Sequence, residues 1–124
     1  MASIEIHRGD IVLVDLSGAI GGEKQNDAGL GARPCVVVQN DGGNKGSPLT
    51  IVAPLTDVAQ YKGYPQQVKA SAAELGPNGK DSIIECGHLR SIDRDKRIKK
   101  HLGAVSPVVI TRIDAALKSS LGLK

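Results

Sequence analysis

Residues 33–41, RPCVVVQND, decide the fold class of this chain. The apolar run at 35–39 is short and rich in valine, whose branched side chain favours a strand, so we expect a buried strand here. Pro34 biases Arg33 toward an extended backbone at the mouth of that strand. Turn-forming residues follow at 40–43, Asn-Asp-Gly-Gly, and predict that the strand ends in a turn.

Similar short apolar segments lie on both sides of this strand. Residues 10–16 (DIVLVDL) partly alternate apolar and polar side chains and predict a first strand. Residues 17–34 are rich in glycine and predict a long exposed loop. The remaining expected strands are 49–55, 66–70, 81–86 and 88–92, with a Gly-Pro-Asn-Gly turn signal at 76–79. Because proline cannot donate to a ladder, Pro54 predicts an edge position or a bulge.

A helix is predicted near the C-terminus. Ser106 is a suitable N-cap, Pro107 suits the first turn, and Gly122 ends the pattern. The apolar face of this helix is expected to consist of Ile110, Ile113, Leu117 and Leu121. Five or six short strands with glycine-rich turns, followed by one helix, predict a mainly β protein with a small barrel. The length predicts a single domain over residues 1–124.

The composition limits the classes of protein and site. Trp and Phe are absent and Tyr occurs twice, so Ile, Val, Leu and Ala must form the core. Cys35 and Cys86 lie in strand-like stretches without a CxxC pair, so we expect buried reduced thiols rather than a zinc site. We expect no metal and no cofactor. The sequence has no leader pattern and no long apolar run, which predicts a soluble cytoplasmic protein without a membrane segment.

The net charge of +3 is unevenly distributed. Residues 90–100 contain six of the sixteen Lys and Arg residues and only two acidic residues. The rest of the chain holds ten basic and eleven acidic residues. A local excess of positive charge is expected where a surface meets a polyanion or an acidic peptide, although a charge run is also common on a plain solvated face.

Six short motifs follow one another in a fixed order along the chain. They are HRGD at 7–10, GE at 22–23, RP at 33–34, QND at 39–41, VAPLT at 52–56 and LRSID at 89–93. Their order and spacing, over essentially the whole chain, resemble the MazF/PemK family of toxin–antitoxin ribonucleases. The resemblance implies a small SH3-like β-barrel of the MazF/PemK–CcdB type with a C-terminal α-helix, assembled as a symmetric homodimer.

The function implied by the resemblance is that of the toxin of a type II pair. Such a toxin is a sequence-specific, metal-independent endoribonuclease that cleaves single-stranded mRNA, an mRNA interferase. Attack by the ribose 2′-hydroxyl leaves a 2′,3′-cyclic phosphate and a 5′-hydroxyl. The implied partner is a cognate antitoxin whose acidic C-terminal segment crosses the basic rim and blocks the RNA groove.

Two residues are the first candidates for catalysis. Arg33 has a planar guanidinium that can pair with phosphate oxygens and stays charged, so it suits the stabilisation of a phosphorane. In the family, the Arg of this Arg-Pro motif is catalytic. Thr56 lies 23 positions later and matches the Thr that family members pair with that Arg. Its hydroxyl can donate to the phosphate or orient the attacking group.

Glu23 and His88 are candidates for proton transfer. Glu23 corresponds to the Glu of the family's Gly-Ser-Glu-Gln motif, although Gly22 and Lys24 here replace Ser and Gln. Relatives commonly have an acidic residue followed by Gln where this chain has Gly87 and His88. Since the acidic residue is a proposed base in part of the family, His88 is expected either to take its place or to read a base edge.

The candidates for RNA binding are spread along the chain. With so few aromatic residues for stacking, specificity is expected to depend on polar groups in a groove. The expected contacts are Lys24, Gln39, Asn40, Lys45, Tyr64 and Arg90, with Arg90 alternatively pairing with Asp93. The loop at 24–32 is longer than in family members and is either a lid over the RNA groove or slack.

Two other functions are compatible with the same fold. A gyrase-targeting toxin acts by binding a protein and needs no catalytic Arg. A degenerate member that binds RNA or antitoxin but cuts weakly is suggested by Gly87 and by the altered motif around Glu23. Retention of Arg33 and Thr56 favours the ribonuclease.

Overall fold

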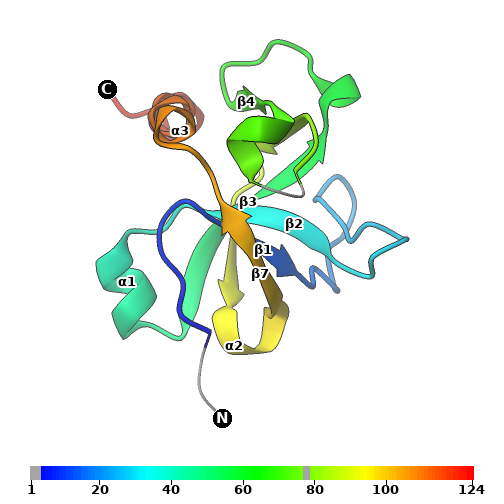
Figure 1. Cartoon of the computed structure of the whole chain (residues 1–124), viewed down its shortest axis with the longest axis vertical. Coiled ribbons are helices and arrows are strands. Elements are labelled where there is room, and N and C mark those ends of the chain that lie inside the picture. The colour runs from blue at the N-terminus through cyan, green and yellow to red at the C-terminus, as the bar shows by residue number, and fades with distance from the viewer. Residues whose placement is uncertain (1–3, 77–78) are drawn as a thin grey trace.

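The computed structural model of the chain describes residues 4–76 and 79–124 (Figure 1). Seven strands in this part form one antiparallel sheet with the order β4-β5-β3-β2-β1-β7, and β6 pairs with β3. The strands are β1 (Asp10–Val14), β2 (Arg33–Val37), β3 (Leu49–Asp57), β4 (Gln67–Ala70), β5 (Ser82–Glu85), β6 (Arg90–Asp93) and β7 (Ile98–Ala104). The helices are α1 (Asp41–Gly46), α2 (Arg94–Arg97) and α3 (Pro107–Leu121), with 3-10 turns η1 (Val58–Gln60) and η2 (Ala72–Leu75).

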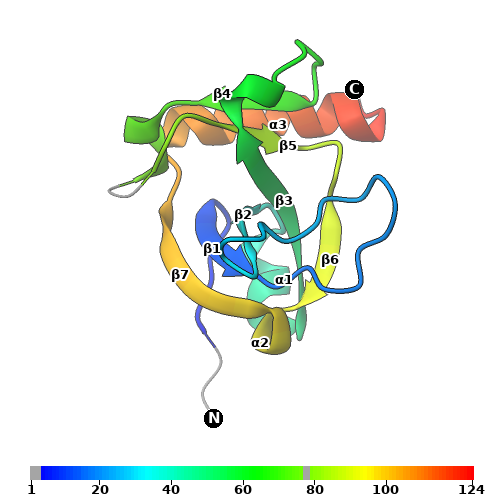
Figure 2. The ribbon, with the colours of Figure 1, turned by 90° about the vertical axis from the view of Figure 1, so that its right-hand side faces the viewer.

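The expected class is confirmed: the protein is mainly β with a C-terminal helix, and the curved sheet is consistent with a small barrel (Figure 2). The predicted strands at 10–16, 35–39, 49–55, 66–70, 81–86 and 88–92 are all present, with ends shifted by at most two residues. None of the helices in the described ranges is long and apolar enough to cross a membrane.

The prediction that Pro54 lies at an edge is wrong, because β3 is a central strand of the sheet. The first part of β3, from Leu49 to Val52, pairs with β6, and the last part, from Leu55 to Asp57, pairs with β5. Pro54 lies between these two parts, where β3 changes its neighbour on that side. Its missing N–H therefore interrupts neither ladder.

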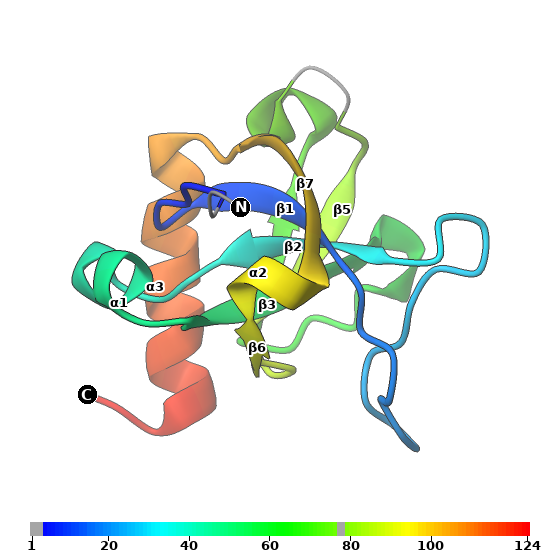
Figure 3. The same ribbon diagram turned by 90° about the horizontal axis from the view of Figure 1, so that it is seen from below.

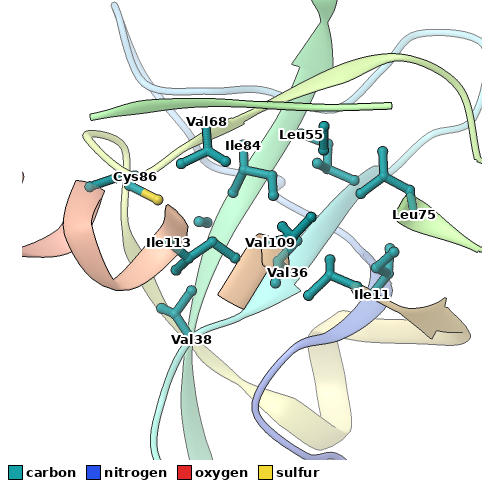
Figure 4. Close-up of a cluster of buried hydrophobic side chains, with 14 residues drawn as sticks. Ile11, Val36, Val38, Leu55, Val68, Leu75, Ile84, Cys86, Val109 and Ile113 are labelled. Carbon is teal, nitrogen blue, oxygen red and sulfur yellow. The ribbon is translucent and has the colours of Figure 1, made fainter. Parts of the chain in front are cut away.

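The alternating side chains of the strands pack into two hydrophobic clusters. One lies between the sheet and α3 and contains Val36, Leu55, Ile84 and Ile113 among others (Figure 4). The other contains Val12, Cys35, Val37, Val52 and Ile92. Neighbouring residues of β2 therefore enter different clusters, as the two-residue period of a strand requires.

Helix α3 begins and ends at the predicted residues. Pro107 occupies its first turn, and Gly122 ends it with a left-handed φ of 70°. Ile113 is buried as predicted, and Ile110 and Leu117 are partly buried against the same cluster. Two details differ: the Ser106 side chain makes no capping hydrogen bond, and Val109 and Ala116 are also buried. Leu121, expected on the buried face, is 57% exposed.

Two elements differ from the sequence prediction. Residues 40–43 do not form a simple turn, because Asn40 accepts a hydrogen bond from the Gly43 N–H and caps α1. Strand β7 was not predicted, since its exposed Lys99, Lys100 and His101 read as a polar run. It is an edge strand, where lysines are common. Of the predicted turn at 76–79, Pro77 and Asn78 lie outside the described residues.

Candidate active site

Arg33 and Thr56 come together through the pairing of β2 with β3. The register pairs Cys35 with Pro54, and extending it by two residues places Arg33 opposite Thr56. Both side chains then lie on the sheet face that carries Cys35 and Pro54, because side chains two residues apart share a face. The 23-residue separation in sequence therefore becomes a cross-strand pair.

The Arg33 guanidinium is held by two backbone carbonyls. Its Nη1 donates to the carbonyl of Leu55 at 3.0 Å, and its Nε donates to the carbonyl of Gln25 at 2.6 Å. Extending the register by one residue places Pro34 opposite Leu55, and proline has no N–H to donate. The Arg side chain thus supplies the donor that Pro34 lacks. These bonds use two of its five N–H groups and leave charge and donors for a ligand.

A pocket of about 420 Å³ reaches the strand residues two positions from this pair, although Arg33 and Thr56 do not themselves line it. Cys35 and Pro54, the neighbours of Arg33 and Thr56 on the same face, form part of its wall. Four predicted site residues also line it: Glu23, Lys24, His88 and Arg90. The structure therefore brings together, around one hollow, residues from the long loop, from β2 and β3, and from the segment that joins β5 to β6.

The loop that carries Glu23 and Lys24 projects from the sheet (Figure 3) and is exposed over most of its length, as predicted. It is anchored at Asp15. The Asp15 carboxylate accepts hydrogen bonds from the Ser17 hydroxyl and from Asn26 Nδ2. Asn26 in turn accepts from the Leu16 N–H at 2.6 Å. The bonds from Ser17 and then Asn26 lower the pKa of Asp15 far below its usual range. Hydrogen bonds among Asp15, Leu16, Ser17 and Asn26 therefore join the two ends of the loop segment 17–26.

Glu23 and His88 face the pocket in different ways. The Glu23 side chain folds back on its own loop, where Oε1 accepts a hydrogen bond from the Ile20 N–H at 3.0 Å. His88 is exposed and closes a turn in which its N–H donates to the Glu85 carbonyl at 3.1 Å. Both side chains are therefore accessible to a substrate in the pocket.

Three of the six basic residues at 90–100 bind backbone carbonyls and so have a structural role. Arg90 donates to the carbonyl of Leu16, and Arg97 donates to those of Asp15 and Ser17, so both hold the start of the long loop. Arg94 donates to the carbonyl of Asn44. Within the described ranges no ion pair joins Arg90 to Asp93, which instead caps α2. The exposed basic surface of the run consists of Lys96, Lys99 and Lys100.

A second pocket, of about 270 Å³, shares Lys24 and His88 with the first. Tyr64, 53% exposed, and Glu85, 5% exposed, also line it. Glu85 is not among the site residues predicted from the sequence. The available signal was an acidic residue in the otherwise apolar strand segment Ile83–Cys86, a position where a charge is rarely buried without a purpose.

Gln39, Asn40 and Lys45 lie away from both pockets. Gln39 Nε2 donates to the carbonyl of Leu49, and Asn40 caps α1, so both side chains serve the local fold. Lys45 lines a different hollow, together with residues 4–7. Helix α1 and the long loop lie at opposite sides of the molecule (Figure 1). The structure does not bring these three residues to the candidate site, and their contact with RNA stays a prediction.

No group of three or more His, Cys, Asp or Glu side chains within residues 4–76 and 79–124 is arranged to hold a metal ion. Both cysteines are free and buried, as predicted. Burial raises the pKa of Cys35, in the wall of the first pocket, and of Cys86 to about 12.

Comparison with known proteins identifies relatives over nearly the whole chain. Residues 7–121 match the model of the family described as PemK-like, MazF-like toxin of type II toxin–antitoxin system. The chain is 40% identical over 118 residues to the endoribonuclease MazF of Staphylococcus epidermidis, a match that covers 95% of this chain and 92% of that protein.

Solved structures share the fold. MazF from Deinococcus radiodurans superposes with a TM-score of 0.74 at 24% identity, covering 97% of this chain and 99% of that one. An endoribonuclease from a mycobacterial species, solved in complex with its cognate antitoxin, gives a TM-score of 0.74 at 22% identity, covering 96% and 97% of the two chains. At these identities the likeness concerns the fold.

Proposed function

The chain belongs to the family of PemK-like, MazF-like toxins of type II toxin–antitoxin systems, and on this premise we propose that it is an endoribonuclease that cuts single-stranded messenger RNA. The observation that carries the proposal is the cross-strand pair of Arg33 and Thr56 beside a pocket lined by loop residues. A cation and a hydroxyl on neighbouring strands suit a phosphodiester that lies across the sheet face.

The proposed reaction needs no metal ion. The ribose 2′-hydroxyl gives up its proton, and its oxygen forms a bond to the adjacent phosphorus. The bond from phosphorus to the 5′ oxygen breaks, and that oxygen takes a proton. The products are a 2′,3′-cyclic phosphate and a 5′-hydroxyl. Arg33 stabilises the negative charge of the phosphorane, and Thr56 donates a hydrogen bond to a phosphate oxygen.

Glu23 and His88 are the proposed groups for the two proton transfers. Both line the pocket beside Arg33, and one can accept the 2′ proton while the other serves the leaving oxygen. The variants Glu23→Gln and His88→Gln keep the size of the side chain. We expect each to lower the rate of cleavage by about 100-fold or more, with RNA affinity retained.

The proposed partners are RNA, a second copy of the chain and an antitoxin. The exposed lysines Lys96, Lys99 and Lys100 give a basic edge that suits the acidic C-terminal segment of an antitoxin. Such a segment would block Arg33 by lying in the groove. The chain is proposed to act in the cytoplasm as a homodimer, because its substrate and its antitoxin are made there.

The test is to incubate purified protein with a long single-stranded RNA in EDTA and to map the new 5′ ends by primer extension. We expect cuts at one short motif, 5′-hydroxyl ends on the products, and no cuts with Arg33→Ala. The same cuts by Arg33→Ala would indicate a contaminating nuclease. A folded dimer that leaves RNA intact but inhibits growth even as Arg33→Ala would favour the gyrase-targeting alternative.

A further inference from the structure

Glu85 is a buried carboxylate that the proposed reaction does not use. It ends β5 and is 5% exposed. Gln67 Nε2 donates to its Oε2 at 3.4 Å, and Lys24 Nζ lies 3.8 Å from the same oxygen. A buried carboxylate costs free energy unless it is paired, so a carboxylate held by one long hydrogen bond and one loop lysine is incompletely satisfied.

The position of Glu85 relative to the reacting groups follows from the sheet. Thr56 pairs with Ile83 in the β3–β5 ladder, so Glu85 lies two residues further along the same face of β5. Two residues of a strand span about 7 Å. With neighbouring strands about 4.8 Å apart, the backbone of Glu85 lies about 8 Å from that of Thr56, within reach of a base next to a phosphate held by the Arg33–Thr56 pair.

The pocket at Glu85 has the features of a base-binding site. Tyr64 offers an exposed aromatic ring, and stacking on such rings is the usual way to hold an unpaired base. Gly87 keeps the rim clear: a Cβ at this position would lie 2.9 Å from Gln66 Cγ, so a larger residue would push the Gln66 side chain.

We propose that this pocket binds a guanine base of the RNA and that Glu85 determines this preference. The inference rests on the proposed endoribonuclease function. Guanine presents two adjacent donors, N1–H and N2–H, on its Watson–Crick edge, and a carboxylate can accept both. The other three bases do not offer such a pair. Tyr64 stacks on the ring, and Gln67 keeps the carboxylate in place.

Lys24 pairs with Glu85 when no RNA is bound. It reaches Glu85 from the long loop and compensates the buried charge while the pocket is empty. When guanine enters, its two N–H groups take over this role, and Lys24 is released toward the RNA backbone. A base that cannot supply two donors leaves the buried carboxylate poorly paired and is rejected for that reason.

The first test maps cleavage sites of three proteins on one long RNA. Wild type is expected to cut at a motif that contains guanine at one fixed position. Glu85→Gln is expected to lose the preference at that position by about 10- to 100-fold and to keep the preference at every other position. The matched control Glu5→Gln changes an exposed Glu near the N-terminus and should leave the motif intact. A wild-type motif without a fixed guanine, or an unchanged motif with Glu85→Gln, overturns the inference.

The second test uses only the wild-type protein, so it decides even if Glu85→Gln does not fold. Inosine at the guanine position of the mapped motif keeps N1–H and removes the 2-amino group. We expect kcat/KM to fall by about 10-fold or more, whereas a fall below twofold would contradict the inference. Failure of the proposed function is separately visible, because wild type would then cut no RNA at all.

Discussion

Arg33 lies opposite Thr56 in the extended β2–β3 register, and its Nη1 donates to the carbonyl of Leu55, the residue before Thr56. The Arg33 side chain therefore makes the hydrogen bond to Leu55 that Pro34 cannot make, and it also places a positive charge at the candidate site. A strand carbonyl and a loop carbonyl hold the guanidinium before any substrate arrives, and such preorganisation favours electrostatic stabilisation of a transition state.

Pro34→Ala tests whether the Arg-Pro pair works in this way. Alanine at this position supplies an N–H that can compete for the Leu55 carbonyl, so the Arg33 side chain would lose one of its two anchors. We expect the cleavage rate to fall by about 10-fold while the fold is kept. The measurement is single-turnover cleavage beside circular dichroism. A rate equal to wild type would show that this anchor does not position Arg33.

Asp15 is expected to control the order of the long loop through pH. Hydrogen bonds from Ser17 and Asn26 lower its pKa in the folded protein. The stabilisation is therefore present above the unfolded pKa of about 3.9 and is lost as the pH falls toward the lower folded value. We expect lower protection of the amides at residues 17–26, relative to their intrinsic exchange rates, in Asp15→Ala than in wild type at pH 6. On acidification the variant should lose less further protection than wild type.

The control for the loop experiment is Asp114→Ala, which removes an exposed carboxylate of α3 that pairs with Arg8. It should leave exchange in the loop as in wild type. Unchanged exchange in Asp15→Ala would mean that the loop is ordered by other contacts, such as the two hydrogen bonds of Arg97.

The prediction of fold from sequence succeeded where local chemistry decides the structure. The valines of β2 alternate between two cores, and Pro107 and Gly122 fix the ends of α3 by their own backbone preferences. The expected edge position of Pro54 is wrong. One part of β3 pairs with β6 and the next part pairs with β5, and these partners are distant in sequence. The polar pattern of β7 does not predict a strand, since an edge strand needs no apolar residues on its exposed side.

Prediction of the site had the same limit. The motif match selected Arg33 and Thr56, and the register accounts for their spacing. It did not select Glu85, whose importance depends on burial and on Lys24 arriving from the loop. Arg90 was expected at the RNA, yet it also anchors the Leu16 carbonyl, a role visible only in three dimensions.

Helix α3 should contribute to stability mainly through its central turn. Ile113 is 1% exposed and packs in the cluster between the helix and the sheet, so Ile113→Ala should lower the free energy of unfolding by about 2–5 kcal/mol. Leu121, on the same helix, is 57% exposed, and Leu121→Ala should cost about 0.5 kcal/mol or less. Urea denaturation of both variants gives the comparison. Equal losses would contradict the assigned packing.

The two cysteines should be inert in the folded protein. Burial raises the pKa of both thiols to about 12, so the reactive thiolate is scarce at pH 8. We expect labelling with a thiol-specific disulfide reagent to be at least about 100-fold slower than in denaturant. Rapid labelling of Cys35 in native protein would mean that the first pocket opens far enough to expose the Cys35 thiol in its wall.

Single-turnover cleavage of one short RNA that contains the mapped motif, by wild type and by Arg33→Ala, tests the central claim most directly. RNA affinity and dimer mass are measured on the same samples. We expect a rate about 100- to 1,000-fold lower in the variant, with affinity changed only a few-fold. A variant that binds and cleaves as fast as wild type would contradict the assignment of Arg33 as the group that stabilises the transition state.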